Sequence, residues 1–180
     1  LFPQFLSLQR ACEQIDAEIF TVSNRTHVDA RNWLATNGGG FENPRKFIEE
    51  VEWLVWIDSD QGFSLKNLET LLNCEEKFCS GWYVKEDASG LPGNHAMAAR
   101  WDEEYFEKHG NMEFLTADEL NGSKEEFVEV DYVGFGFTKV HTDLLKQMEY
   151  PYFRQKVVKV GKYKENTSED VTFCRDCYEI

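Results

Sequence analysis

The apolar run Trp53–Ile57, followed at once by Asp58-Ser59-Asp60, constrains the fold more than any other feature of the sequence. An apolar run that ends abruptly in polar residues is typical of a buried central strand. Side chains alternate along a strand, so Asp58 and Asp60 point the same way and Ser59 points elsewhere. Two carboxylates aimed at one place repel each other unless a cation lies between them, and oxygen ligands suit Mg²⁺ or Mn²⁺. The pattern predicts a metal site, although Asp-x-Asp is also common by chance in a polar loop after a strand.

Strand and helix patterns alternate in the first half of the chain, which favours an α/β sheet with crossover helices. Thr26, Ser64, Thr142 and Ser168 are the residue types that cap helices. We expect helices over residues 2–15, 26–36, 47–51, 64–72, 142–148 and 168–177. We expect strands over residues 17–22, 54–57, 78–84, 95–101, 127–133, 137–140 and 157–160, with loops over 37–44 and 87–94.

The bulk properties fit one acidic globular domain over residues 1–180. Hydrophobic residues make up 42% of the chain, which is enough for one core. The formal net charge is −14, and such a surface repels nucleic acid and the anionic face of a membrane. An acidic protein that handles a phosphorylated ligand needs a cation between the two, which agrees with the predicted metal site.

Five cysteines at irregular spacing favour free thiols in a reducing compartment, so we expect a cytoplasmic protein. Cys174-x-x-Cys177 is half of a zinc pattern, but a closed zinc site needs four ligands and the sequence offers no second pair. No uncharged apolar run approaches the length of a transmembrane helix.

Three further motifs are candidates for ligand contacts. Arg31-Asn32 lies inside the second expected helix, where a solvated face is the simpler interpretation. Gly134-Phe135-Gly136 lets the backbone approach a ligand closely, or forms a bulge in a strand. Glu169-Asp170 follows a cap, where the helix dipole favours carboxylates; Asp170 is also placed to act as a proton acceptor.

The order of these motifs resembles the GT-A glycosyltransferases, especially the family 2-like enzymes. The resemblance covers most of residues 17–178. The similar segments are Ile19–Val22 with Ala30–Asn32, Trp53–Asp60, Cys79–Tyr83, Val130–Phe137, Pro151–Phe153 and Ser168–Phe173. The family's first strand, and the segment beyond its Glu-Asp helix, are not visible in this sequence.

The resemblance implies a GT-A type, Rossmann-like fold, with a central mixed, mostly parallel sheet flanked by helices. It also implies a metal-dependent transferase that moves a sugar from a nucleoside diphosphate donor, expected to be a UDP-sugar, to a glycan or other hydroxyl acceptor. We expect Asp60 to bind Mn²⁺ or Mg²⁺ directly.

The remaining candidates receive supporting roles in this hypothesis. Asp58 would support the metal or the ribose, with Ser59, Asn32 and the Gly134–Gly136 segment near the donor. Arg31 would lie near the donor or hold Asp58 in position. We expect inverting transfer with Asp170 as general base and Glu169 as a contact to the acceptor.

Two alternatives stay open. A haloacid-dehalogenase-type phosphatase also places Asp-x-Asp after an apolar strand, but its motif prefers Thr or Val where this chain has Gly62. A sugar- or nucleotide-binding module that has lost turnover is the non-enzymatic alternative.

Overall fold

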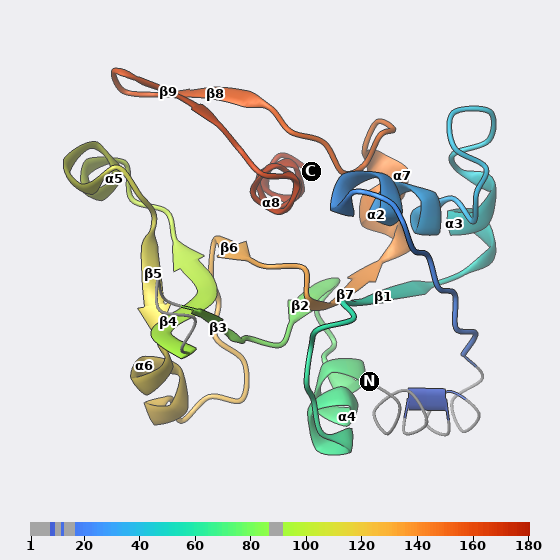
Figure 1. The fold of residues 1–180 in the computed structure, drawn as a ribbon, viewed down its shortest axis with the longest axis horizontal. Helices are drawn as coiled ribbons and strands as arrows, with labels where there is room; N and C mark the ends of the chain where they lie inside the picture. Colours follow the sequence, from blue (N-terminus) through green and yellow to red (C-terminus); the bar gives the residue numbers. More distant parts are fainter. Residues whose placement is uncertain (1–7, 10–11, 13–16, 87–91) are drawn as a thin grey trace. The chain divides into compact units, whose positions relative to one another are not determined.

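The computed structural model describes residues 8–9, 12, 17–86 and 92–180, and the chain separates into two compact units. The first unit contains residues up to Gly81 together with Phe135–Phe153. The second contains Trp82–Gly134 and Arg154–Ile180. The elements of both units are labelled in Figure 1.

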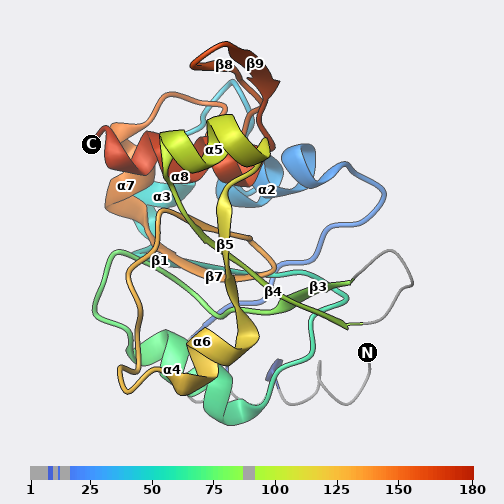
Figure 2. The ribbon, with the colours of Figure 1, turned by 90° about the vertical axis from the view of Figure 1, so that its left-hand side faces the viewer.

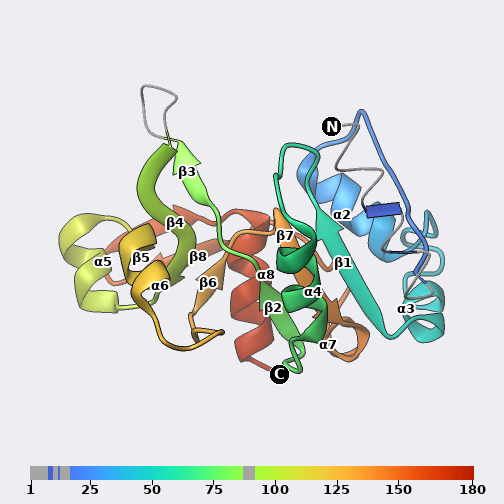
Figure 3. The same cartoon turned by 90° about the horizontal axis from the view of Figure 1, so that it is seen from below.

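A three-stranded antiparallel sheet organises the first unit. Its order is β1 (Trp53–Ile57), β7 (Phe137–His141) and β2 (Phe78–Ser80). The register pairs Trp53 with His141 and Ile57 with Phe137. The helices of this unit are α2 (His27–Ala35), α3 (Lys46–Glu50), α4 (Leu65–Asn73) and α7 (Thr142–Gln147). Helix α4 packs on β7, and Figure 3 shows the two elements together.

Aromatic rings fill the interior of the first unit. The rings of Trp56, Phe135 and Phe153 lie 5.2 to 5.9 Å apart, and Phe135 and Phe153 are fully buried. Such edge-to-face contacts add to the stabilisation that burial itself provides. The indole nitrogen of Trp56 is buried without a hydrogen-bond partner among the described residues.

Lys139 of β7 connects the sheet to α4. Its ammonium group donates to the carbonyl oxygens of Leu72 and Cys74, both at 2.7 Å, and lies 3.9 Å from the centre of the Trp53 ring. Burial lowers the pKa of Lys139. Its positive charge complements the carboxyl end of the helix dipole.

Antiparallel strands also organise the second unit. Its strands are β3 (Val84–Glu86), β4 (Pro92–Arg100), β5 (Glu113–Thr116) and β6 (Tyr132–Val133), with β4 paired to the other three, and a separate hairpin of β8 (Val157–Val160) and β9 (Tyr163–Asn166). Figure 2 shows α5 (Glu103–His109) near one end of β5 and α6 (Ala117–Gly122) at the other. Helix α8 (Glu169–Tyr178) completes the unit and packs on β6.

The prediction of a GT-A type, Rossmann-like fold with a mostly parallel sheet is wrong, because every pairing between described strands is antiparallel. Strand β1 lies at one end of its sheet rather than at the centre, and Val55 is 37% exposed. An apolar run carries no information about the direction of its partner. Here the partner is β7, which arrives from a distant part of the chain.

Other differences are local. Residues 17–22 form no strand, since they are mostly exposed and pair with no described strand. The expected strand over 78–84 is split into β2 and β3, and that over 127–133 is reduced to β6. The cap of α7 is His141, not Thr142. The helix over 2–15 and residues 87–91 of the expected loop lie largely or wholly outside the described residues.

Cys74 and Cys79 form a disulfide, which corrects the expectation of free thiols for this pair. The turn between α4 and β2 brings their Cα atoms to 6.6 Å, within the range that a disulfide spans. Cys174 and Cys177 are free; burial raises the pKa of the Cys174 thiol to about 12.

Among the described residues, none of the helices has both the length and the apolar character that a bilayer crossing demands. The expected partners and compartment stay predictions.

Candidate functional site

The two carboxylates of the Asp-x-Asp motif lie in the turn that follows β1. The backbone N–H of Asp58 donates to the carbonyl oxygen of Gly136 at 2.9 Å, which extends the β1–β7 ladder by one bond. The N–H of Gln61 then donates to the carbonyl oxygen of Asp58 at 3.0 Å and closes the turn. Ser59 and Asp60 are exposed in this turn. The backbone of Asp58 is therefore fixed by the sheet, whereas Asp60 is exposed to solvent.

Asp58 is held by a buried arginine. A guanidinium nitrogen of Arg31, on α2, lies 3.3 Å from a carboxylate oxygen of Asp58. The side chain of Arg31 is 7% exposed and that of Asp58 is 35% exposed. The guanidinium also lies over the Phe135 ring, 5.4 Å from its centre. Of the two positions expected for Arg31, the structure thus shows the contact with Asp58.

Helix α2 is fixed at two points, which sets the position of Arg31. The hydroxyl of Thr26 accepts from the N–H of Asp29 and caps the helix, as its sequence predicts. The side-chain amide of Asn32 makes two hydrogen bonds with the backbone of Phe153. Its nitrogen donates to the carbonyl oxygen at 2.6 Å, and its oxygen accepts from the N–H at 3.0 Å. These bonds give Asn32 a structural role next to Arg31 instead of a role as a ligand contact.

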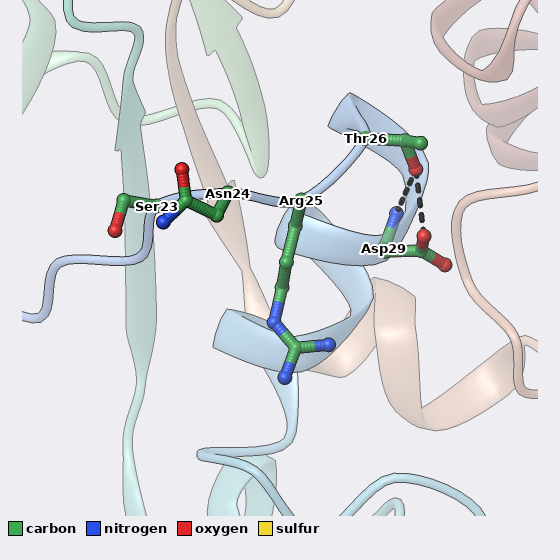
Figure 4. A pocket seen from close by; sticks show the side chains of 5 residues that line it. All are labelled: Ser23, Asn24, Arg25, Thr26 and Asp29. Atoms are coloured by element: carbon green, nitrogen blue, oxygen red, sulfur yellow. Dashed lines mark hydrogen bonds between the residues drawn. The ribbon is translucent and has the colours of Figure 1, made fainter.

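A shallow hollow lies at the start of α2 in the same unit. Figure 4 shows its lining of Ser23, Asn24, Arg25, Thr26 and Asp29. Thr26 and Asp29 bind each other, while the Arg25 side chain extends away from them and lies over the Trp33 ring, 5.5 Å from its centre. Asn24 adopts a left-handed backbone with φ of 58°. Asparagine tolerates this conformation better than most residues.

The glycine-containing segment has structural tasks in the structure. Gly134 donates its N–H to Met97, and a Cβ atom on it would meet the side chain of Tyr83. Phe135 is part of the aromatic interior, and Gly136 bonds to the backbone of Asp58. Gly134 belongs to the second unit, whereas Phe135 and Gly136 belong to the first.

Asp170 lies in the first turn of α8, in the second unit. One carboxylate oxygen accepts from the hydroxyl of Tyr132 at 2.9 Å; the other accepts from the backbone N–H of Val171 at 2.9 Å and from the hydroxyl of Ser168. Burial, and then the charge of Asp170, raise the pKa of Tyr132 well above its usual value, so its hydroxyl keeps the proton that it donates. Glu169 is buried, with 9% exposed.

Tyr132 is a contact of the candidate base that the sequence does not predict. The two-residue spacing between Val130 and Tyr132 places them on one face of an extended segment, but nothing in that pattern points to a carboxylate 38 residues later. Phe135 was expected near a ligand, and its role beneath Arg31 was also missed.

No three His, Cys, Asp or Glu side chains of the described residues gather into a group that could hold a metal ion. Asp58 and Asp60 supply two carboxylates in one turn. Mg²⁺ is commonly held by one or two carboxylates together with substrate phosphates, and Mn²⁺ also suits oxygen ligands, so this donor set fits either cation.

Comparisons with known proteins give no family for the chain. No family model and no curated protein matches it. Among solved structures, the crystal structure of A197 from STIV is similar with a TM-score of 0.47 and 17% sequence identity, over 93% of this chain and 68% of that one. A similarity at this level assigns neither a family nor an activity.

Proposed function

We propose that the protein is a divalent-cation-dependent glycosyltransferase that uses a nucleoside diphosphate sugar, with UDP as the nucleotide. The observation that carries this proposal is the unequal treatment of the two carboxylates of the motif. Asp58 forms an ion pair with the buried Arg31, whereas Asp60 is exposed and forms no ion pair with any described residue. The resemblance of the ordered motifs to family 2-like glycosyltransferases supplies the reaction class.

The two carboxylates have different tasks in this proposal. Arg31 offsets the charge of Asp58, so Asp58 serves chiefly to orient the turn and to support the cation or the ribose. Asp60 binds Mn²⁺ or Mg²⁺ directly. When bound, the cation would neutralise charge on the diphosphate as the nucleotide leaves.

Asp170 is the second, separate part of the proposal. We assign it the role of general base in an inverting transfer. Its carboxylate would take the proton from an acceptor hydroxyl while that oxygen bonds to the anomeric carbon and the bond to the diphosphate breaks. Support comes from the three donors that orient the carboxylate. General base catalysis of this kind contributes ~10²–10⁴-fold to a rate.

The decisive experiment compares Asp60→Asn with Asp118→Asn, which makes the same change at an exposed position in α6. Binding of UDP is measured by calorimetry with and without Mn²⁺. We expect Mn²⁺ to strengthen binding by the wild type and by Asp118→Asn, and to have no effect on Asp60→Asn. Equal cation-dependent binding by all three proteins would remove Asp60 from the site. Stronger cation-dependent binding of GDP or TDP would overturn the choice of nucleotide.

A transfer assay tests Asp170. We expect Asp170→Asn to lose about 10²-fold or more in kcat while UDP binding stays unchanged, and the product to have inverted anomeric configuration. A retained configuration, or near-normal turnover, would remove Asp170 from the role of base.

The alternatives give different results in the same assays. A non-catalytic module would bind UDP with Mn²⁺ and show no transfer or hydrolysis. A haloacid-dehalogenase-type phosphatase would hydrolyse phosphate monoesters, and a trapped aspartyl-phosphate mimic would lie on Asp58.

A further inference from the structure

The segment that contains the hairpin of β8 and β9 is basic in an otherwise acidic protein. Residues 154–166 carry five Lys or Arg residues and one acidic residue, Glu165, in a chain that has 33 acidic residues and a net charge of −14. The five cations are Arg154, Lys156, Lys159, Lys162 and Lys164. So steep a local reversal of charge needs a physical explanation.

Two of the five cations have a structural explanation. Arg154 donates to a carboxylate oxygen of Asp176 at 2.7 Å, and Lys156 donates to the other oxygen. Lys159, Lys162 and Lys164 are exposed, and none of them forms an ion pair with any residue that the structure describes. The ammonium group of Lys162 lies 5.2 Å from the centre of the neighbouring Tyr163 ring.

The arrangement of these lysines works against the stability of the hairpin. Lys159 and Lys164 are directly opposite each other in the β8–β9 ladder. Like charges in that position destabilise a strand pair. A Glu at either position would form a favourable pair instead, so folding does not account for two lysines there.

The hairpin has two different faces. Val160 is buried on the inner face, and the hydroxyl of Tyr163 donates to the carbonyl oxygen of Glu107 in α5 at 3.5 Å. Figures 1 and 2 show the hairpin with α5 and α8. By strand alternation, the outer face carries Val157, Lys159 and Lys164, and Val157 is 72% exposed.

We propose that the outer face of this hairpin docks on an anionic lipid surface. Lysines around an exposed apolar side chain fit the interface of a membrane, where the cations meet lipid phosphates and carboxylates and the apolar side chain enters the headgroup boundary. Nucleic acid is the poorer fit, because the aromatic side chain of the hairpin, Tyr163, contacts α5 instead of being available to stack on bases. At physiological salt, acidic residues more than about 8 Å from the membrane surface are largely screened from it, so the net negative charge of the chain does not prevent docking.

This docking surface does not depend on the proposed transferase activity. Each lysine near an anionic surface contributes about 1 kcal/mol, which is about fivefold in partitioning, so three lysines give on the order of 100-fold. Binding of this strength is reversible, and it weakens as salt is raised.

Vesicle co-sedimentation of the full chain tests the proposal. Vesicles of phosphatidylserine and phosphatidylcholine are compared with vesicles of phosphatidylcholine alone. The test variant is Lys159→Gln/Lys162→Gln/Lys164→Gln. The control is Lys66→Gln/Lys108→Gln/Lys124→Gln, which removes the same charge at exposed positions elsewhere. We expect wild type and control to bind only the anionic vesicles, and the test variant to lose on the order of 100-fold in partitioning.

Several outcomes would overturn the proposal. They are no binding of the wild type to anionic vesicles, equal binding to neutral vesicles, or equal losses in the two triple variants. Binding of single-stranded RNA that requires the three lysines, without vesicle binding, would make the hairpin a nucleic-acid surface instead.

A single substitution separates docking from folding. Lys164→Glu places opposite charges across the strands, so we expect it to raise the melting temperature slightly and to lower vesicle binding at least fivefold. A hairpin whose lysines served the fold would lose stability in this variant.

Discussion

The two units each contain an ion pair with one buried partner, but the buried partner differs. In the Arg31–Asp58 pair of the first unit the cation is buried, whereas in the second unit the carboxylate of Asp176 is buried. Arg31 is 7% exposed and its partner Asp58 is 35% exposed. Asp176 is 8% exposed, and its partners Arg154 and Lys156 are 27% and 40% exposed. The first arrangement presents a carboxylate to solvent on a fixed support. The second encloses a carboxylate and uses two side chains to hold β8 near α8.

This difference predicts which substitution costs more stability in each unit. A charge that stays buried after its partner is removed is expensive, while one that can reach water is not. For the ion pairs of Asp176, we therefore expect removal of the cations to cost more stability than removal of the carboxylate. For the Arg31–Asp58 pair, we expect removal of the carboxylate to cost more than removal of the arginine.

The largest effect is expected for Arg154→Gln/Lys156→Gln, which leaves the enclosed Asp176 without its two cations. We expect a loss of about 3 kcal/mol in the free energy of unfolding, measured by urea denaturation. Asp176→Asn should cost only about 1 kcal/mol, because the cations that remain are partly solvated and have long flexible stems. The reverse order would show that the burial of Asp176 is not what makes this pair important.

The next effect concerns the first unit. Asp58→Asn takes the carboxylate from a buried guanidinium, and we expect it to cost about 2 kcal/mol. Arg31→Met leaves a carboxylate that is one-third exposed and keeps apolar contact with Phe135, so we expect a cost of about 1 kcal/mol or less. Thermal melts of the two variants at neutral pH give the comparison. Equal costs would mean that the two partners of the Arg31–Asp58 pair are not distinguished by burial.

The smallest effect concerns Asp170, which binds a neutral hydroxyl instead of a cation. Tyr132→Phe removes that bond and should cost about 1 kcal/mol at neutral pH. The pKa of Tyr132 is raised by burial and by Asp170, so its contribution is fully present below the unfolded value of about 10 and is lost as the pH rises further. Unfolding of wild type and variant, followed from about pH 8 to about pH 11, should therefore converge at the alkaline end. A constant difference would exclude this linkage.

The sequence predicted helices better than sheets for reasons visible in particular residues. Helices α2 and α4 are capped by Thr26 and Ser64, whose hydroxyls bind backbone N–H groups only three residues away, so the signal is local. The capping box of Thr116 and Glu119 at α6 was present in the sequence and was missed. Strand direction is not local: β1 pairs with β7, and nothing in Trp53–Ile57 specifies that partner or its direction.

The candidate site was predictable to a similar extent. The abrupt end of the apolar run predicts that the Asp-x-Asp turn is exposed at its end. The contact of Arg31 with Asp58 is one of the two roles expected for Arg31. The structural bonds of Asn32, Gly134 and Gly136 were not predictable, because each joins segments that are far apart in the sequence. Whether Asp60 binds a cation and Asp170 accepts a proton stays a prediction.

The central position of β7 also has a consequence for synthesis on the ribosome. Ile57 pairs with Phe137, so the last residue of β1 is made 80 residues before its partner. At about 5–20 residues per second, that delay is about 4 to 16 s. During this time neither β1 nor β2 has the strand that joins them, since they pair with β7 and not with each other. The nascent chain therefore carries the apolar segment Trp53–Ile57 without its partner while most of the second unit is still being made.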